Sequence, residues 1–182
     1  MKNSSKMLRV LDLGSGLKVR VPGACRLDRS LDGKPTVVAD LDRHSLPFLD
    51  RSFDRILCIQ ILEHFSDIPR IMDELHRLCR PGGTLEIVTP HFSHRNAFTD
   101  PTHKHQFGAR SFDFFLTAEK PLRFMTISTS ARFELVSRSL SFGPAWINVG
   151  RLLYRLFGLD TYETYLSGIF PASDIKIVLK AL

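Results

Sequence analysis

The fold is decided by the stretch Leu8-Arg9-Val10-Leu11-Asp12-Leu13-Gly14-Ser15-Gly16. Apolar and polar residues alternate along it and then meet two glycines, which is typical of a first strand that ends at a ligand-binding edge. Glycine at that position lets the backbone approach a ligand closely. Gly14 and Gly16 are therefore candidates for a nucleotide-binding turn, although a lone GxG sequence is equally compatible with a simple tight turn.

An acidic residue, Asp28, ends the second strand-like run, at residues 24–27. In this position a carboxylate can accept hydrogen bonds from both hydroxyls of a ribose, and a solvated turn carboxylate is the other interpretation. A dinucleotide-binding fingerprint would place the acid about 20 residues after the glycines and a third small residue where Val19 stands. The nicotinamide interpretation is disfavoured accordingly.

Further strand-like runs continue to the end of the chain. Their alternation with a helix predicts a mainly parallel, open sheet of seven strands in an α/β fold with right-handed crossovers. The runs after the first two are 36–41, 56–60, 84–89, 133–142 and 175–182. Phe53 and Asp54 are expected to start the fourth strand.

The fourth strand is followed by a predicted helix, in which apolar residues recur at helical spacing from Ile68 to Leu78. Ser66 is expected to cap this helix, and Pro69 is tolerated because it falls in the first turn. By contrast, only residues 14–23 separate the first two strands, where a parallel crossover normally needs a dozen residues or more. The first crossover helix is therefore expected to be shortened or absent.

Several segments stand together in a characteristic order. They are Leu11-Asp12-Leu13-Gly14-Ser15-Gly16, Ala39-Asp40-Leu41, the run 46–56, Ile61-Leu62-Glu63-His64, and the run 74–83 that ends in Arg80-Pro81-Gly82-Gly83. In these segments the chain resembles the class I S-adenosylmethionine-dependent methyltransferases, specifically the methyltransferase type 11 subgroup. The resemblance covers residues 8 to 90 and is looser beyond them. It implies a Rossmann-like sheet with an antiparallel last strand, and S-adenosyl-L-methionine as methyl donor.

The resemblance also implies roles for individual residues. The turn around the cofactor would consist of Asp12, Gly14, Ser15 and Gly16. Asp28 would bind the ribose, Asp40 and Leu41 would flank the adenine, and Gln60 would face the methionine part. The chain departs from the family at Lys18, which replaces a third glycine, and at Gln60, where many relatives have histidine.

Four of the seven histidines lie between Pro90 and Phe107. Imidazoles titrate near neutrality, so His91 and His94 are the candidates for removing a proton from the methyl acceptor, and His103 is a candidate for binding it. Metal binding through His91, His94, His103, His105 and Asp100 is a second interpretation, but the ligand spacing is not recognisable and no metal site is expected. A third is a polar loop packed by phenylalanines. Glu63 and His64 are expected to cap or pack, with His64 kept as an outside candidate for the site.

The second half holds further acceptor-side candidates. A helix is predicted at residues 149–157, and Tyr162 and Tyr165 follow it where related enzymes often build an acceptor cap. We expect one methyltransferase domain over residues 1–182, with a flexible N-terminus at 1–7 and acceptor-side insertions at 91–130 and 143–174. Cys25, Cys58 and Cys79 are widely spaced among apolar residues and are expected to be buried reduced thiols.

The length, composition and net charge limit the classes of function that are possible. With 182 residues and 43% apolar content the chain can bury a sizeable core, and no apolar run is long enough to span a membrane. No signal peptide is recognisable, so a cytoplasmic protein is expected. The net charge of +6 is concentrated in the second half, which favours polyanions only weakly.

The sequence therefore predicts an S-adenosylmethionine-dependent methyltransferase acting on an unidentified acceptor, for which a small molecule is favoured over a nucleic acid. A familiar nucleobase-methylating motif of the Asn-Pro-Pro-Tyr type is missing after the fourth strand, where Cys58-Ile59-Gln60-Ile61 stands instead. The alternative is a non-catalytic module of the same fold that binds RNA or another polyanion through its basic, aromatic second half. A lipid or polyketide-like acceptor is a further possibility that the sequence does not rank.

Overall fold

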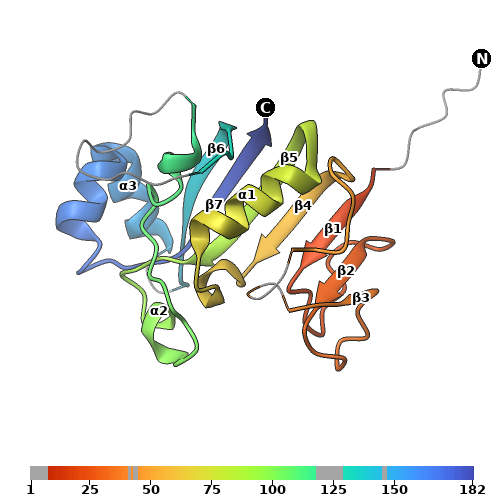
Figure 1. Cartoon of the computed structure of the whole chain (residues 1–182). Helices are drawn as coiled ribbons and strands as arrows, with labels where there is room; N and C mark the ends of the chain where they lie inside the picture. Colours follow the sequence, from red (N-terminus) through yellow and green to blue (C-terminus); the bar gives the residue numbers. More distant parts are fainter. Residues whose placement is uncertain (1–7, 41, 43–44, 118–128, 145–146) are drawn as a thin grey trace, which may run out of the picture.

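The centre of the molecule is one seven-stranded sheet of order β3-β2-β1-β4-β5-β7-β6 (Figure 1). The computed structural model describes residues 8–40, 42, 45–117, 129–144 and 147–182. The first five strands are parallel to one another, and β7 is antiparallel to both β5 and β6. The strands are β1 (Val10–Leu13), β2 (Cys25–Asp28), β3 (Val37–Val38), β4 (Phe53–Ile59), β5 (Cys79–Pro90), β6 (Phe133–Phe142) and β7 (Ala172–Ala181).

This sheet confirms the predicted Rossmann-like fold with its antiparallel last strand. The sixth strand has the predicted bounds, and Phe53 begins β4 as expected. The third strand is much shorter than the predicted run 36–41, since only Val37–Val38 pair with β2. Leu41 and the N-terminal residues 1–7 lie outside the described residues.

The connection from β1 to β2 contains no helix, and all of its residues, 14–24, are described. It runs through turns and returns the chain to pair β2 with β1 in parallel, with Leu11 opposite Cys25. The prediction of a missing first crossover helix is therefore confirmed. No helix therefore follows the glycine turn, and other groups must take the place of that helix at this edge of the sheet.

Helix α1 (Ile68–Leu78) crosses the front of the sheet in Figure 1. It buries Ile71, Met72, Leu75 and Leu78. The prediction that Ser66 caps the helix is wrong, because the carboxylate of Asp67 accepts the backbone N–H of Arg70 at 3.0 Å instead. The amide and hydroxyl of Ser66 both donate to Asp42, a partner that is distant in the sequence.

The second half of the chain places short helices around the carboxyl ends of the parallel strands and beside β6. Helix α3 (Ile147–Thr161) confirms and extends the helix predicted at 149–157, with a break in its helical geometry at Gly158. Its Leu153 packs against the core, whereas Leu152 and Leu156 are exposed. The elements are η1 (Leu62–His64), α2 (Asn96–Thr99), η2 (Asp113–Phe115), α3 (Ile147–Thr161) and η3 (Tyr162–Leu166).

Two further structural facts concern membrane-spanning helices and the state of the cysteines. Among the described residues, no helix has both the length and the apolar character needed to cross a membrane. All three cysteines are free; Cys58 and Cys79 are buried and Cys25 is half-buried. Burial raises the pKa of Cys79 to about 11, which makes it an unreactive thiol at neutral pH.

Candidate active site

A cavity of about 570 Å³ opens at the carboxyl ends of the parallel strands. In Figure 1 the arrowheads of β1 and β4 point to this lower edge of the sheet. Three of the residues predicted to bind a cofactor, Gly14, Asp28 and Asp40, line the cavity together. Parallel strands end at a common edge, so residues from separate strand ends converge there.

The Asp28 carboxylate holds the glycine turn in place. Its Oδ2 accepts the backbone N–H of Gly16 at 2.8 Å, and its Oδ1 accepts that of Ser30 at 2.9 Å. A carboxylate has about four lone-pair positions, so acceptor capacity remains for a ligand hydroxyl in the cavity. Gly16 is thus fixed by Asp28, although it does not itself line the cavity.

Gly14 sits where the chain has no room for a side chain. Its φ of +60° lies in the left-handed region, and an added Cβ would come within 2.5 Å of Cγ1 of Ile61. Ile61 lines the same cavity. The close packing of these two residues therefore sets the shape of the cavity beside the turn.

Asp12 and Ser15 of the predicted turn are fully buried and lie behind the cavity wall. The Asp12 carboxylate accepts a hydrogen bond at 2.8 Å from Arg20, whose guanidinium also donates to the carbonyl of Ser15 at 3.1 Å. Burial raises the pKa of Asp12, and Arg20 opposes that rise. The structure gives Asp12 a supporting position behind the turn, and Arg20 is a residue that sequence reasoning missed.

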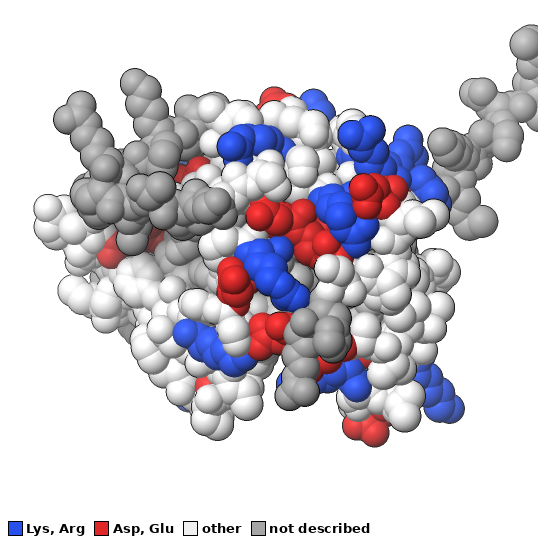
Figure 2. Space-filling view, viewed as in Figure 1, with Lys and Arg blue, Asp and Glu red and all other residues white. Residues whose placement is uncertain are grey.

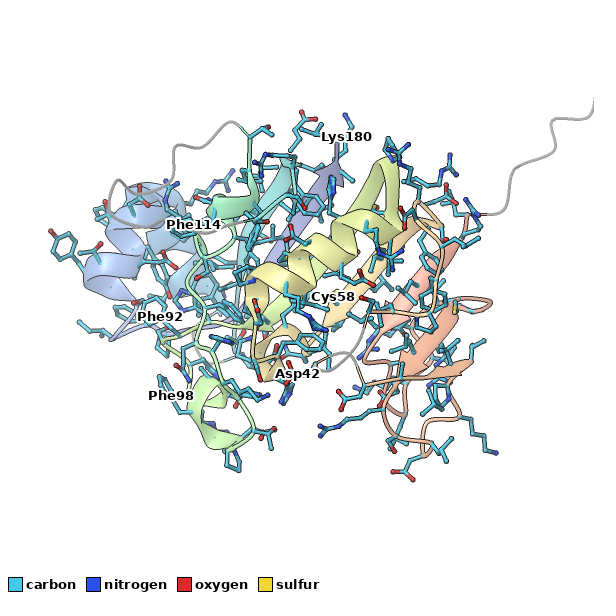
Figure 3. All side chains as sticks on the ribbon, viewed as in Figure 1. Asp42, Cys58, Phe92, Phe98, Phe114 and Lys180 are labelled. Atoms are coloured by element: carbon cyan, nitrogen blue, oxygen red, sulfur yellow. The ribbon has the colours of Figure 1, made fainter. Side chains whose placement is uncertain are left out.

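A hydrogen-bonded ion pair from two distant segments forms another wall of the cavity. Lys104 Nζ lies 2.7 Å from Asp42 Oδ2 and 2.6 Å from the hydroxyl of Ser66. The hydrogen bond from Lys104, followed by that from the Ser66 amide, lowers the pKa of Asp42 to about 2. Figure 3 labels Asp42 at the lower edge of the sheet. Neither Asp42 nor Lys104 was predicted, although Lys104 belongs to the histidine-rich segment that the sequence singled out.

A second cavity, of about 610 Å³, adjoins the first, and the two share His64 and Pro101 in their walls. Two predicted site residues, Gln60 and His103, line this second cavity. Gln60 has a left-handed φ of +55°, and its side-chain amide donates to Asp174 of β7 at 2.8 Å. Its predicted contact with the methionine part of a cofactor stays a prediction.

Glu63 is the most unusual group of the second cavity. Its residue is 1% exposed, and its Oε2 accepts a hydrogen bond from Thr89 Oγ1 at 3.1 Å. Its Oε1 has no hydrogen-bond partner among the described residues. Burial raises the pKa of this carboxyl. The capping or packing role expected for Glu63 does not account for an unpaired buried oxygen beside a cavity.

The two histidines predicted to act as bases line neither cavity. His91 is fully buried, with Nε2 2.9 Å from Glu163 Oε1 and Nδ1 2.8 Å from Ser93 Oγ. His94 is half-buried, and its Nδ1 accepts the amide of Asn96 at 3.3 Å. A base must come within hydrogen-bond reach of the proton it removes, so their catalytic role remains a prediction that this arrangement does not favour.

The two predicted tyrosines also lie away from both cavities. Tyr162 is fully buried, and its hydroxyl donates to the carbonyl of Phe170 at 2.5 Å. Tyr165 is 73% exposed. Their predicted role in binding the acceptor has no support from this geometry, because a buried Tyr162 belongs to the core of the C-terminal half.

Comparisons with known proteins agree with the fold. Residues 21–87 match the family model of a methyltransferase domain, Methyltransf_11. The methyltransferase GfsG of Streptomyces halstedii is 46% identical over 47 residues, which cover 26% of this chain and 17% of that protein. The demethylmenaquinone methyltransferase of Thermotoga maritima is 28% identical over 133 residues, which cover 62% of this chain and 57% of that protein.

Solved structures extend the likeness to almost the whole chain. An S-adenosylmethionine-dependent methyltransferase from Mesorhizobium loti superposes with a TM-score of 0.60 at 16% identity, covering 95% of this chain and 90% of its own. At a sequence identity this low, the structural likeness concerns the fold alone. The chain spans less than two thirds of the length of both curated relatives, 17% and 57%. The predicted resemblance to class I methyltransferases of the type 11 subgroup is confirmed.

Proposed function

We propose that this chain is an S-adenosylmethionine-dependent methyltransferase that modifies a small molecule. The observation that carries the proposal is the pair of adjoining cavities: the first is lined by Gly14, Asp28 and Asp40, and the second shares His64 with it. A donor and an acceptor held in neighbouring cavities can be aligned for direct transfer.

The first cavity fits the nucleoside part of the donor. The Asp28 carboxylate faces it from the end of β2 and keeps free acceptor positions for ribose hydroxyls. The turn at Gly14 brings backbone to the cavity wall without a Cβ. Ala39 is a small side chain next to Asp40 in the same wall, where a flat base can lie.

The chemistry requires positioning above all. The sulfonium of the donor makes its methyl group electrophilic, so the carbon–sulfur bond breaks as the acceptor atom bonds to the methyl and a neutral thioether leaves. What the chain contributes is alignment, plus a group that takes the acceptor's proton where one must be lost. His103 and His64 line the second cavity, whereas His91 and His94 line neither cavity.

The alternative is a module that binds RNA or another polyanion, and ion pairing of basic residues argues against it. Several basic residues of the second half are paired: Lys104 with Asp42, Arg110 with Asp160, and Arg138 with Asp113. Figure 2 shows Lys and Arg side chains interleaved with Asp and Glu across the visible face. Paired charges attract phosphates less than a free basic patch does. Lys120 and Arg123 lie outside the described residues.

The test is calorimetric titration of the purified protein with S-adenosylmethionine and with its demethylated product. We expect binding, and about a tenfold or larger loss of affinity in Asp28→Ala, because a hydrogen bond to a charged group contributes about 1.5–3 kcal/mol. Glu134→Ala, on β6 and outside both cavities, is the matched control. Circular dichroism checks folding, since Asp28 also holds Gly16.

Absence of heat and of any thermal shift at millimolar donor would contradict the proposal. If the donor binds, methyl incorporation into fractions of a cell extract would then identify the acceptor. RNA binding with a steep salt dependence, and no affinity for the donor, would instead support the polyanion-binding alternative.

A further inference from the structure

We propose that Glu63, His64 and His103 form a binding site for a divalent transition-metal ion, with Zn²⁺ as the ion that fits best. Each of the three residues offers one ligating atom, and these atoms all lie within 4.8 Å of one another. Two imidazoles and one carboxylate are a donor set that holds zinc while leaving a coordination position open.

The spacing of the three groups is close to that of a formed site. The rings of His64 and His103 have centroids 4.7 Å apart and meet edge to face. Zinc–ligand bonds of about 2.0–2.2 Å require the ligating atoms to be roughly 3–4 Å apart. Side-chain adjustments of about 1 Å bring the three atoms to these distances.

The Glu63 carboxylate supplies a second, independent indication. It is almost fully buried, and among the described residues its Oε1 has no hydrogen-bond partner. A buried polar atom left without a partner costs about 1–3 kcal/mol, and more when it is charged. A cation bound at this oxygen would remove that cost, and Thr89 already fixes the other oxygen.

His64 is oriented by a relay that leaves its outer nitrogen available. The hydroxyl of Thr102 donates to Asp100 Oδ1 at 2.7 Å, and it must therefore accept from His64 Nδ1, which lies 2.9 Å away. His64 then carries its proton on Nδ1 and a lone pair on Nε2. Carboxylate or hydroxyl partners of this kind orient histidine ligands in known metal sites.

His103 is set up in the same way. Its Nδ1 lies 3.4 Å from the carbonyl of Ala97, which can only accept, so the proton belongs on Nδ1 and the lone pair on Nε2. That Nε2 is 3.9 Å from Asp100 Oδ2. The Asp100 carboxylate therefore adds negative potential beside the site, which favours a cation.

Main-chain hydrogen bonds hold the two segments of the site together. The backbone amides of Lys104 and His105 both donate to the carbonyl of Glu63, at 2.8 and 3.3 Å. The three ligand residues thus meet because the histidine-rich segment is tied to η1, which follows β4. Of the histidines weighed above as metal ligands, only His103 belongs to a group of this kind among the described residues.

All three residues line the second cavity. An open coordination position on the ion would face that cavity and take water or an oxygen-bearing group of a molecule held there. If that molecule is the methyl acceptor, the ion would lie beside the reaction, and this part of the inference rests on the proposed function. Metal binding itself does not.

The test is titration of untagged, chelator-treated protein with Zn²⁺ alone, followed by calorimetry. We expect one ion per chain at micromolar or lower concentration. Glu63→Gln, which keeps the shape of the side chain, and His64→Ala and His103→Ala should each weaken binding more than tenfold. Thr102→Val should weaken it by about 10- to 100-fold, because it removes a partner that orients His64.

His94→Ala is the matched control, since it removes a histidine of the same segment that lies outside the group, and it should bind zinc like the unchanged protein. Co²⁺ gives a second readout on that protein: strong visible absorption indicates imidazole ligation in a low-coordinate site. Weak absorption like that of the hydrated ion, or zinc binding that is equal in Glu63→Gln and the unchanged protein, would overturn the proposal. Titration of the same samples with S-adenosylmethionine shows separately whether the proposed function fails.

Discussion

The guanidinium of Arg20 lies 2.8 Å from the carboxylate of Asp12, at the edge of the sheet where the first crossover helix is missing. Its Nη1 also donates to the carbonyl of Ser15. In folds with that helix, N–H groups at the helix start lie near this turn. Here one side chain of the short connection, that of Arg20, supplies hydrogen-bond donors to the turn.

The Arg20–Asp12 pair should therefore be important for stability. Arg20→Ala leaves the fully buried Asp12 without its partner, and we expect a loss of about 3 kcal/mol in the free energy of unfolding at neutral pH. Because burial raises the pKa of Asp12 above its ordinary 3.8, protonation at lower pH removes the unpaired charge, so the loss should shrink as the pH falls. Urea unfolding followed by circular dichroism measures both effects.

Arg151→Ala, on the exposed side of α3, is the control for this prediction and should change stability by no more than about 0.5 kcal/mol. An Arg20→Ala protein as stable as this control would show that the pair does not hold the connection.

The glycines of the turn should differ in their tolerance of alanine. Gly14→Ala meets both a left-handed φ and the side chain of Ile61, and we expect a loss of about 2–4 kcal/mol. Gly16→Ala has the same backbone strain but nothing within 4 Å of the added Cβ, so about 1–2 kcal/mol is expected. Gly143→Ala, which has neither problem, serves as the control.

Thermal unfolding of the three alanine proteins tests this order. Equal stability of Gly14→Ala and Gly16→Ala would mean that Ile61 moves freely and does not shape the cavity.

The Asp42–Lys104 pair should give a pH-dependent contribution to stability. The pKa of Asp42 is lowered from 3.8 to about 2, so the carboxylate stabilises the folded state above the unfolded value, and the contribution is lost as the pH falls from 3.8 through about 2. The pair is partly exposed, so the effect should be about 1 kcal/mol or less. Asp42→Asn should be less stable near neutrality and equal to the unchanged protein at the acid end.

Denaturant unfolding at a series of pH values measures this difference directly. Glu134→Gln, which breaks the exposed pair with Lys180 instead, is the matched control. A stability difference for Asp42→Asn that persists unchanged to the acid end would contradict an electrostatic origin.

Patterns that act over a few residues were predictable. The alternation in residues 133–142 gave the bounds of β6, and Gly14 of the glycine turn and Asp28 lie together in the wall of the first cavity. These features follow from local periodicity and from the rule that parallel strands end at one edge. The cap of α1 shows that even a local prediction can fail. Ser66 was expected to cap this helix, but its amide and hydroxyl donate to Asp42, and its neighbour Asp67 caps the helix instead.

Contacts between distant segments were not predictable in the same way. His91 looked available in the sequence, yet it is buried against Glu163, 72 residues away. Lys104 reaches Asp42 across 62 residues. Periodicity carries no information about which distant side chain fills a given space, so the sequence could single out the histidine-rich segment but not which of its histidines line a cavity.

The sequence by itself determined the sheet, the missing first crossover and the glycine turn at the carboxyl end of β1, because strand alternation and glycine turns depend on neighbours along the chain. Only the tertiary structure decided that Arg20 supports this turn from behind and that Glu63 meets His64 and His103. The grouping of Glu63, His64 and His103 depends on where the backbone amides of Lys104 and His105 find an acceptor, and the carbonyl of Glu63 provides it only in the folded chain.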